Sequence, residues 1–253
     1  MDGVAVLVRL LGPVEAADGG GWVRAGTPKR CCVLAALALS PGEALSNEAL
    51  ANRVWSGSPP SSARGVIYGH IAQLRGLLER HEGLRLTRGA DGYRLDLPHE
   101  QVDVFRARGL ASRARAAADA GEHPRAAELW REAARLWRGP ALSGVDGTWA
   151  GRIRAQLEGD HHVVAVGRCE AELALGRHAE VLSELEALAA RHPLSETLAA
   201  QLMLALYRGG RVAEALARFG EMRDRLRREL GADPGEQLRD MHRRILRQDP
   251  DLA

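Results

Sequence analysis

Three side chains suited to an anionic partner fall in line on one side of residues 61–78. They are Arg64, Tyr68 and Arg75. A guanidinium group pairs with phosphate oxygens or donates two hydrogen bonds to a guanine edge, and a phenol contacts phosphate or a thymine methyl group. Aspartate and glutamate are absent from this stretch, as expected for a surface that meets phosphates. These residues predict a face that binds nucleic acid, with the solvated face of an ordinary helix as the alternative.

Residues 61–78 have the apolar rhythm of an amphipathic helix. On a helical wheel the predicted core side holds Ala63, Val66, Ile67, His70, Ile71, Leu74, Leu77 and Leu78. The opposite side holds Ser61, Arg64, Tyr68, Ala72 and Arg75. The preceding "PPSS" places backbone N–H groups and the hydroxyls of Ser61 and Ser62 at the start of the helix, which predicts a phosphate anchor.

The elements around this helix are expected in the order strand, strand, three helices and hairpin. They are "VAVLVRLLG" (4–12), "GGGWVRAG" (19–26), "TPKRCCVLAALALS" (27–40), "LSNEALANRVW" (45–55), the helix above and "LRLTRGADGYRLDL" (84–97). Pro28 suits a first helical turn, and Ser46 is the expected N-cap of the second helix. The last segment alternates around a Gly/Asp-rich centre, which indicates a hairpin. This order is typical of a winged helix-turn-helix.

The positive charge of the chain is concentrated near this unit. The formal net charge is only +2, and residues 99–253 hold 24 basic and 24 acidic residues. Residues 61–94 hold six arginines, Arg80 among them, against three carboxylates that include Glu82. On the predicted hairpin, Thr87 and Arg88 are the candidates for phosphate or minor-groove contact, and Arg88 is a better candidate than Arg94. Solvated arginines are the alternative reading of the hairpin.

The rest of the chain contains a helical repeat. "GRHAEVLSEL" from Gly176 matches "GRVAEALARF" from Gly210 at a shift of 34 residues, and a weaker copy begins at Gly121. Such a period is typical of tetratricopeptide repeats, here interrupted by an insertion around "WRGPALSGVDGTW" (137–149). We therefore expect a mainly α protein with a small β component. A winged helix-turn-helix at residues 1–98 is followed by a tetratricopeptide-like all-α domain at residues 99–253.

No motif predicts catalysis, a metal or a cofactor. Asp160, His161 and His162 lack a second ligand pair at helical spacing, and no phosphate-binding loop with its lysine is present. The three cysteines form no C-x-x-C pair and suit free thiols. The N-terminus lacks a secretion signal, and the longest apolar run is far shorter than the roughly 20 residues that span a bilayer. We expect a cytoplasmic protein that is not an enzyme and does not enter membranes.

Longer strings in both halves resemble a known family. "VLVRLLGPVEA", "SSARGVIYGHIAQLRGLL" and "LTRGADGYRL" resemble the OmpR-type winged helix. "RHPLSETLAAQLMLALYRGGRVAEAL" and "RRELGADPGEQLRDMHRRIL" resemble the bacterial transcriptional activation domain. In this order they are similar to a Streptomyces antibiotic regulatory protein of the small, single-module kind. The resemblance implies an activator that binds direct repeats in promoter DNA as a homodimer. It also implies recruitment of RNA polymerase with its principal sigma factor to an antibiotic or other secondary-metabolite gene cluster.

Two sets of residues are expected to make contacts, the first implied by the resemblance and the second drawn from the helix and hairpin described above. The loop that contacts polymerase would be Trp55, Ser56, Gly57, Ser58, Pro59 and Pro60. The DNA-binding set would be Ser61, Ser62, Arg64, Tyr68, Ala72, Gln73, Arg75, Thr87 and Arg88. Tyr68, His70, Ala72 and Gln73 replace the residues usual in the family, so we expect a different operator sequence. The alternative function is a tetratricopeptide-type interaction scaffold whose winged helix binds protein rather than DNA.

Overall fold

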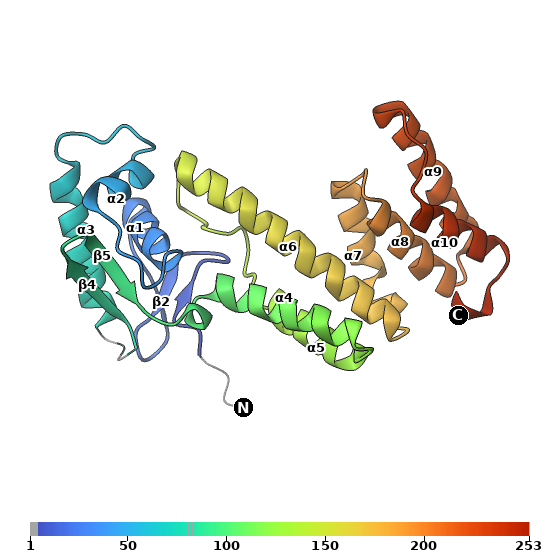
Figure 1. Ribbon diagram of the computed structural model, residues 1–253, viewed down its shortest axis with the longest axis horizontal. Coiled ribbons are helices and arrows are strands. Elements are labelled where there is room, and N and C mark those ends of the chain that lie inside the picture. Colours follow the sequence, from blue (N-terminus) through green and yellow to red (C-terminus); the bar gives the residue numbers. More distant parts are fainter. Residues whose placement is uncertain (1–4, 80, 82, 253) are drawn as a thin grey trace. The chain divides into compact units, whose positions relative to one another are not determined.

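The computed structural model describes residues 5–79, 81 and 83–252. The chain forms two compact units (Figure 1). The first contains residues 1–113 and 131–164, and the second contains residues 114–130 and 165–253. Val4, the first residue of the earliest strand predicted from the sequence, lies outside the described residues, as do Arg80 and Glu82 of the charge count.

A three-stranded antiparallel sheet opens the first unit. Its strands, in order, are β1 (Val8–Arg9), β2 (Glu15–Ala17) and β3 (Trp22–Arg24). Ala16 pairs with Val8 on one side and with Val23 on the other. The sequence indicated strands at β1 and β3 but missed β2. Glu and Ala are poor strand formers, so β2 exists because both of its neighbours supply hydrogen-bonding edges.

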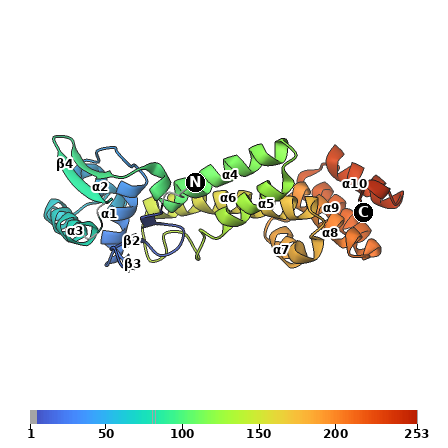
Figure 2. The ribbon, with the colours of Figure 1, turned by 90° about the horizontal axis from the view of Figure 1, so that it is seen from below.

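Three helices and a hairpin complete the winged helix. They are α1 (Pro28–Ala38), α2 (Asn47–Val54), α3 (Ala63–Leu78), β4 (Arg85–Gly89) and β5 (Gly92–Asp96). The Ser46 hydroxyl accepts a hydrogen bond from the N–H of Ala49 at 3.1 Å, so the predicted N-cap is confirmed. Figures 1 and 2 both show α3 beside the β4–β5 hairpin.

The core of the winged helix lies around α1 and Tyr93. Every residue from Cys31 to Ala38 is buried, and Tyr93 is 1% exposed. The backbone N–H and C=O groups of Tyr93 bond those of Leu45 at 2.9 and 2.8 Å, which joins β5 to the segment before α2. Gly92 makes this approach possible, because a Cβ atom there would lie 2.1 Å from the Leu45 oxygen. Glycine at this position is therefore required by packing.

Residues after the hairpin return to the first sheet. The 3-10 turn η1 (His99–Gln101) leads into α4 (Asp103–Asp119), which is followed by α5 (His123–Ala134) and α6 (Thr148–Ala174). The predicted insertion around residues 137–149 runs along the strand ends: the N–H of Arg138 bonds Leu11 O at 2.8 Å, and the N–H of Leu142 bonds Leu10 O at 2.9 Å. The domain boundary expected at residue 98 stays a prediction. Residues on both sides of it belong to the first compact unit.

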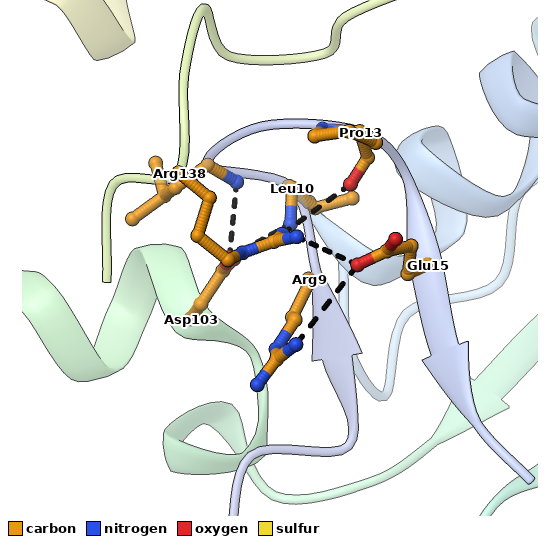
Figure 3. Close-up of polar contacts among 7 residues, drawn as sticks. Arg9, Leu10, Pro13, Glu15, Asp103 and Arg138 are labelled. Atoms are coloured by element: carbon orange, nitrogen blue, oxygen red, sulfur yellow. Dashed lines mark hydrogen bonds and ion pairs between the residues drawn. The ribbon is translucent and has the colours of Figure 1, made fainter. Parts of the chain in front are cut away.

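A buried cluster of charged residues holds the start of α4 and the segment before α6 against the first sheet (Figure 3). Asp103 is 1% exposed, and its carboxylate accepts the N–H of Leu10 at 2.8 Å and the N–H of Leu11 at 3.0 Å. Arg138 lies 3.8 Å from the same carboxylate and binds Glu15 at 2.6 Å. The first turn of α4, the strand ends and the segment before α6 are thereby joined in one network.

The second unit repeats one arrangement, in which two helices are joined by a tight turn that contains glycine. It contains α7 (His178–Arg191), α8 (Glu196–Arg208), α9 (Val212–Leu230), α10 (Glu236–Leu246) and the turn η2 (Pro250–Leu252). Gly121, Gly176 and Gly210 follow the ends of α4, α6 and α8, with φ of 75°, 73° and 74°. In each turn the next N–H bonds the carbonyl five residues earlier, at 2.8 to 2.9 Å. These matching turns confirm the repeat seen in the sequence and the mainly α fold.

Candidate nucleic-acid interface

The helix α3 buries a narrower face than the wheel predicted. Its buried residues are Ala63, Ile67, Ile71, Leu74 and Leu78. Val66, which the wheel placed on the core side, is 36% exposed, and His70 and Leu77 are only partly buried. The prediction for Val66 was wrong because α1, α2 and β4 cover one stripe of α3 and stop short of this position.

The middle of the exposed face of α3 carries almost no side chains. Gly65, Gly69, Ala72 and Gly76 are all exposed and succeed one another at helical spacing. We call these four residues the small-residue ridge. A Cβ atom at any of its three glycines would meet nothing within 4 Å, so packing does not require glycine there. Each glycine costs about 0.5–1 kcal/mol of helix stability relative to alanine. The ridge lets a partner approach the helix backbone closely.

One edge of the ridge is joined to the hairpin through Tyr68. Arg88 Nη2 donates to the Tyr68 hydroxyl at 2.9 Å. The guanidinium groups of Arg88 and Arg64 lie 5.3 and 5.9 Å from the Tyr68 ring centroid. Hydrogen bonding from Arg64, followed by the charges of Arg88 and Arg64, lowers the pKa of the Tyr68 phenol. Arg64, Tyr68 and Arg88 thus form one cationic cluster rather than three independent side chains.

Arg75 has a structural role that the sequence did not indicate. Its Nε donates to Leu86 O at 2.9 Å, which ties α3 to β4, and its guanidinium group lies 6.0 Å from the Tyr93 ring. The side chain is half-buried. The terminal nitrogens of a guanidinium group carry four further donors, so this role leaves Arg75 able to bind an acceptor on a partner.

The other candidate DNA-binding residues fall into two groups. Ser61, Ser62, Ala72 and Gln73 are exposed on α3 or just before it, and Ser62 makes no capping hydrogen bond. Thr87 is engaged within the hairpin, where its hydroxyl donates to Asp96 at 2.9 Å. Arg94 is also held by Asp96, at 2.5 Å. Asp96 therefore neutralises Arg94, whereas Arg88 is exposed and contacts Tyr68.

The loop from Trp55 to Pro60 is exposed except at Trp55. The Trp55 ring packs against the core with Lys29 Nζ 4.7 Å from its centroid. Ser56 has a left-handed backbone with φ of 56°, and its hydroxyl accepts the N–H of Thr148 at 3.0 Å. The first turn of α6 therefore holds this loop in a defined conformation.

The groups considered for other chemistry have structural partners. Asp160 binds Arg108 at 2.8 Å, and His161 stacks on Trp137 with 5.0 Å between ring centroids. Within the described residues, no three His, Cys, Asp or Glu side chains are grouped so that they could hold a metal ion. Burial raises the pKa of Cys32 to about 12 and that of Cys169 to about 11, so both remain unreactive thiols.

Comparison with known proteins covers both halves of the chain. The model of the bacterial transcriptional activator domain matches residues 102–246, and that of the transcriptional regulatory protein C-terminal domain matches residues 23–95. The regulatory protein DnrI of Streptomyces peucetius is 38% identical over 256 residues, which cover 97% of this chain and 93% of DnrI. The chain belongs to the Streptomyces antibiotic regulatory protein family. It combines an OmpR-type winged helix with a bacterial transcriptional activator domain.

Longer members of the family contain the same module. The regulatory protein AfsR of Streptomyces coelicolor is 40% identical over 245 residues, which are 96% of this chain but only 24% of AfsR. The solved structure of Mycobacterium tuberculosis EmbR in complex with a low-affinity phosphopeptide superposes with a TM-score of 0.86 at 35% identity. The match covers 97% of this chain and 66% of the EmbR chain. No helix in the described part of this family member is both long and apolar enough to cross a membrane.

Proposed function

We propose that this activator binds direct repeats in promoter DNA through α3 and the β4–β5 hairpin, as a head-to-tail homodimer. The observation that carries the proposal is the exposed face of α3, where the Arg64–Tyr68–Arg88 cluster borders the small-residue ridge and no carboxylate intervenes. A surface of this kind suits the major groove, which admits an α-helix and exposes distinct base edges. The bound protein recruits RNA polymerase holoenzyme to an antibiotic or secondary-metabolite gene cluster.

Different parts of the face have different tasks in this arrangement. Ser61 and Ser62 anchor a phosphate at the start of α3. Arg64 and Gln73 flank the small-residue ridge and read base edges on either side of it. Arg88, oriented by Tyr68, binds the backbone phosphate next to the groove. Since Tyr68 and Gln73 depart from the residues usual in the family, the operator differs from the family's common heptamer.

The dependence of binding on salt distinguishes DNA recognition from the scaffold alternative. Phosphate contacts release counterions, so raising salt from 50 to 200 mM should weaken promoter binding at least about tenfold. A scaffold that held peptides in the cavity of about 570 Å³ between α7, α8 and α9 would respond far less. Fluorescence anisotropy with labelled promoter DNA measures the slope, and footprinting on adjacent promoters locates the repeats. A salt-independent affinity, or protection without repeats, would contradict the proposal.

The small-residue ridge gives a second test. Gly69→Ala should make the free protein about 0.5–1 kcal/mol more stable, because alanine is the better helix former and its methyl group meets open space. The same methyl group should hold α3 away from the groove floor and weaken promoter binding by about tenfold, as the loss of one specific contact does. Thermal unfolding and anisotropy measure the two effects.

Gly109→Ala is the matched control for this test. Gly109 is exposed on α4, and a Cβ atom there also meets nothing within 4 Å. This variant should gain similar stability and bind DNA as the wild type does. An unchanged affinity for Gly69→Ala would show that the ridge does not approach DNA.

A further inference from the structure

A polar hollow of about 450 Å³ lies beside the Trp55–Pro60 loop, between α2 and the first turns of α6. Its lining includes Asn52, Arg53, Ser56, Thr148, Trp149 and Arg152. Residues from distant parts of the sequence therefore build it. Neither the DNA-binding face of α3 nor the Asp103 network contributes a residue to this lining.

The charge of the hollow is uniformly positive. Two arginines line it and no carboxylate does. Within the described part of the chain, neither Arg53 nor Arg152 has an ion pair, whereas arginines such as Arg108, Arg138 and Arg211 each bind a carboxylate. Arg152 is exposed. In a chain where arginines are commonly paired, two unneutralised guanidinium groups in one hollow indicate an acidic ligand.

Arg53 is held in place for this role. Its Nη1 donates to Ala36 O at 3.3 Å, and its guanidinium group lies 5.6 Å from the Trp149 ring centroid. Burial lowers the pKa of Arg53, but a guanidinium group remains charged at neutral pH. A charged group whose position is fixed in advance loses little side-chain freedom when it binds a partner.

The first N–H group of α6 is already engaged. The N–H of Thr148 already bonds the Ser56 hydroxyl at 3.0 Å, and a Cβ atom at Gly147 would lie 2.9 Å from that same oxygen. This close contact fixes the loop against the helix. The cations that line the hollow are the two guanidinium groups, and the partly buried Trp149 ring forms an apolar wall beside them.

We propose that this hollow binds an acidic segment of RNA polymerase holoenzyme, with a carboxylate between Arg53 and Arg152 and an apolar side chain against Trp149. The inference rests on the proposed function, because the hollow adjoins the loop assigned there to polymerase contact. The Trp149 ring beside the two guanidinium groups suits a protein segment, which can present a carboxylate and an apolar side chain together, better than a phosphate backbone, which carries no apolar side chain. The contact surface thus combines the winged helix with the first turns of α6.

Arg152→Glu in the full-length protein tests this inference, with purified holoenzyme and promoter DNA as probes. Placing a carboxylate against an acidic segment should lower activated transcription in vitro at least about tenfold, since like-charge contacts cost several kcal/mol at an interface. Promoter affinity should stay within about twofold of wild type and thermal unfolding should not change, because Arg152 is exposed and remote from α3 in the sequence. Arg152→Lys keeps the charge and should retain most of the activity.

Arg113→Glu provides the matched control, since Arg113 is an exposed arginine of the same unit that does not line the hollow. It should activate transcription normally. Full activation by Arg152→Glu would overturn the inference, and so would a loss of promoter affinity as large as its loss of transcription, which would make the hollow a DNA contact. A wild-type protein that fails to bind the promoter would instead contradict the proposed function itself.

Discussion

Promoter DNA is expected to bind the Arg64→Ala/Arg75→Ala double variant at least about 100-fold more weakly than the wild type, because a good bidentate arginine contact contributes about 1–3 kcal/mol. Arg64 is exposed at the edge of the ridge, and Arg75 keeps terminal donors beyond its bond to Leu86. Anisotropy at several salt concentrations measures the loss. Helical circular dichroism should match the wild type, since neither residue belongs to the buried face of α3.

The single variants separate the two arginines. Arg64→Ala removes a partner of Tyr68 and should weaken promoter binding by about 1–3 kcal/mol while relaxing the base preference at the position that Arg64 reads. Arg75→Ala also removes the donor to Leu86 O, which ties α3 to β4. It should therefore loosen the hairpin from α3 and weaken the contact between Arg88 and the DNA phosphate. Arg113→Ala, on α4, serves as the control for loss of an exposed arginine. If the double variant shifted promoter DNA in a gel at the same protein concentrations as the wild type, the assignment of α3 as the recognition helix would be contradicted.

Local patterns were enough to predict most elements of the winged helix. The third helix, the Ser46 cap and the hairpin depend on spacing within a few residues, and the structure has all three. β2 could not be predicted, because it depends on strands that pair with it rather than on its own residues. The pairing of Asp103 with Leu10 joins positions 93 residues apart, and no local periodicity encodes such a contact.

The sequence indicated which residues line the candidate site better than it indicated the contacts that they make. The exposed positions of Ser61, Arg64 and Ala72 follow from helical periodicity. The internal bonds of Arg75 and Thr87 do not, because they depend on where the hairpin folds against α3. The small-residue ridge did leave a signal in the sequence. Three glycines within one amphipathic helix oppose helix formation, and such a conflict between propensity and structure is expected at functional sites.

Asp103→Ala is expected to destabilise the first unit by about 2–6 kcal/mol, because each of two buried N–H groups left without an acceptor costs about 1–3 kcal/mol. The substitution leaves the N–H groups of Leu10 and Leu11 buried without their acceptor, and it removes one of the two carboxylates beside Arg138, which keeps its ion pair with Glu15. Urea unfolding followed by tryptophan fluorescence measures the change. Four tryptophans belong to the first unit, namely Trp22, Trp55, Trp137 and Trp149. Stability within about 1 kcal/mol of wild type would show that the network contributes little.

Asp103→Asn, which keeps the shape but cannot titrate, isolates the charge of this residue. Burial raises the pKa of Asp103 to about 6 from an ordinary 3.8, against the opposing effects of the Leu11 and Leu10 N–H groups and of Arg138. Between these values the folded protein holds more protons than the unfolded chain, so rising pH favours unfolding. The stabilisation due to the protonated carboxyl is complete below about pH 4 and is lost as pH rises through about 6.

The wild type should therefore lose stability relative to Asp103→Asn as pH rises through this window, by up to about 1.4 kcal/mol per pH unit. Groups that titrate in both proteins cancel in the difference, so the comparison reports on Asp103 alone. Above this window the carboxylate is charged, and its hydrogen bonds from Leu10 and Leu11 and the nearby Arg138 offset part of the cost of burying it. Parallel stability curves for the two proteins from pH 4 to 7 would mean that the Asp103 pKa is not raised. In that case these contacts would compensate the burial of the charge in full.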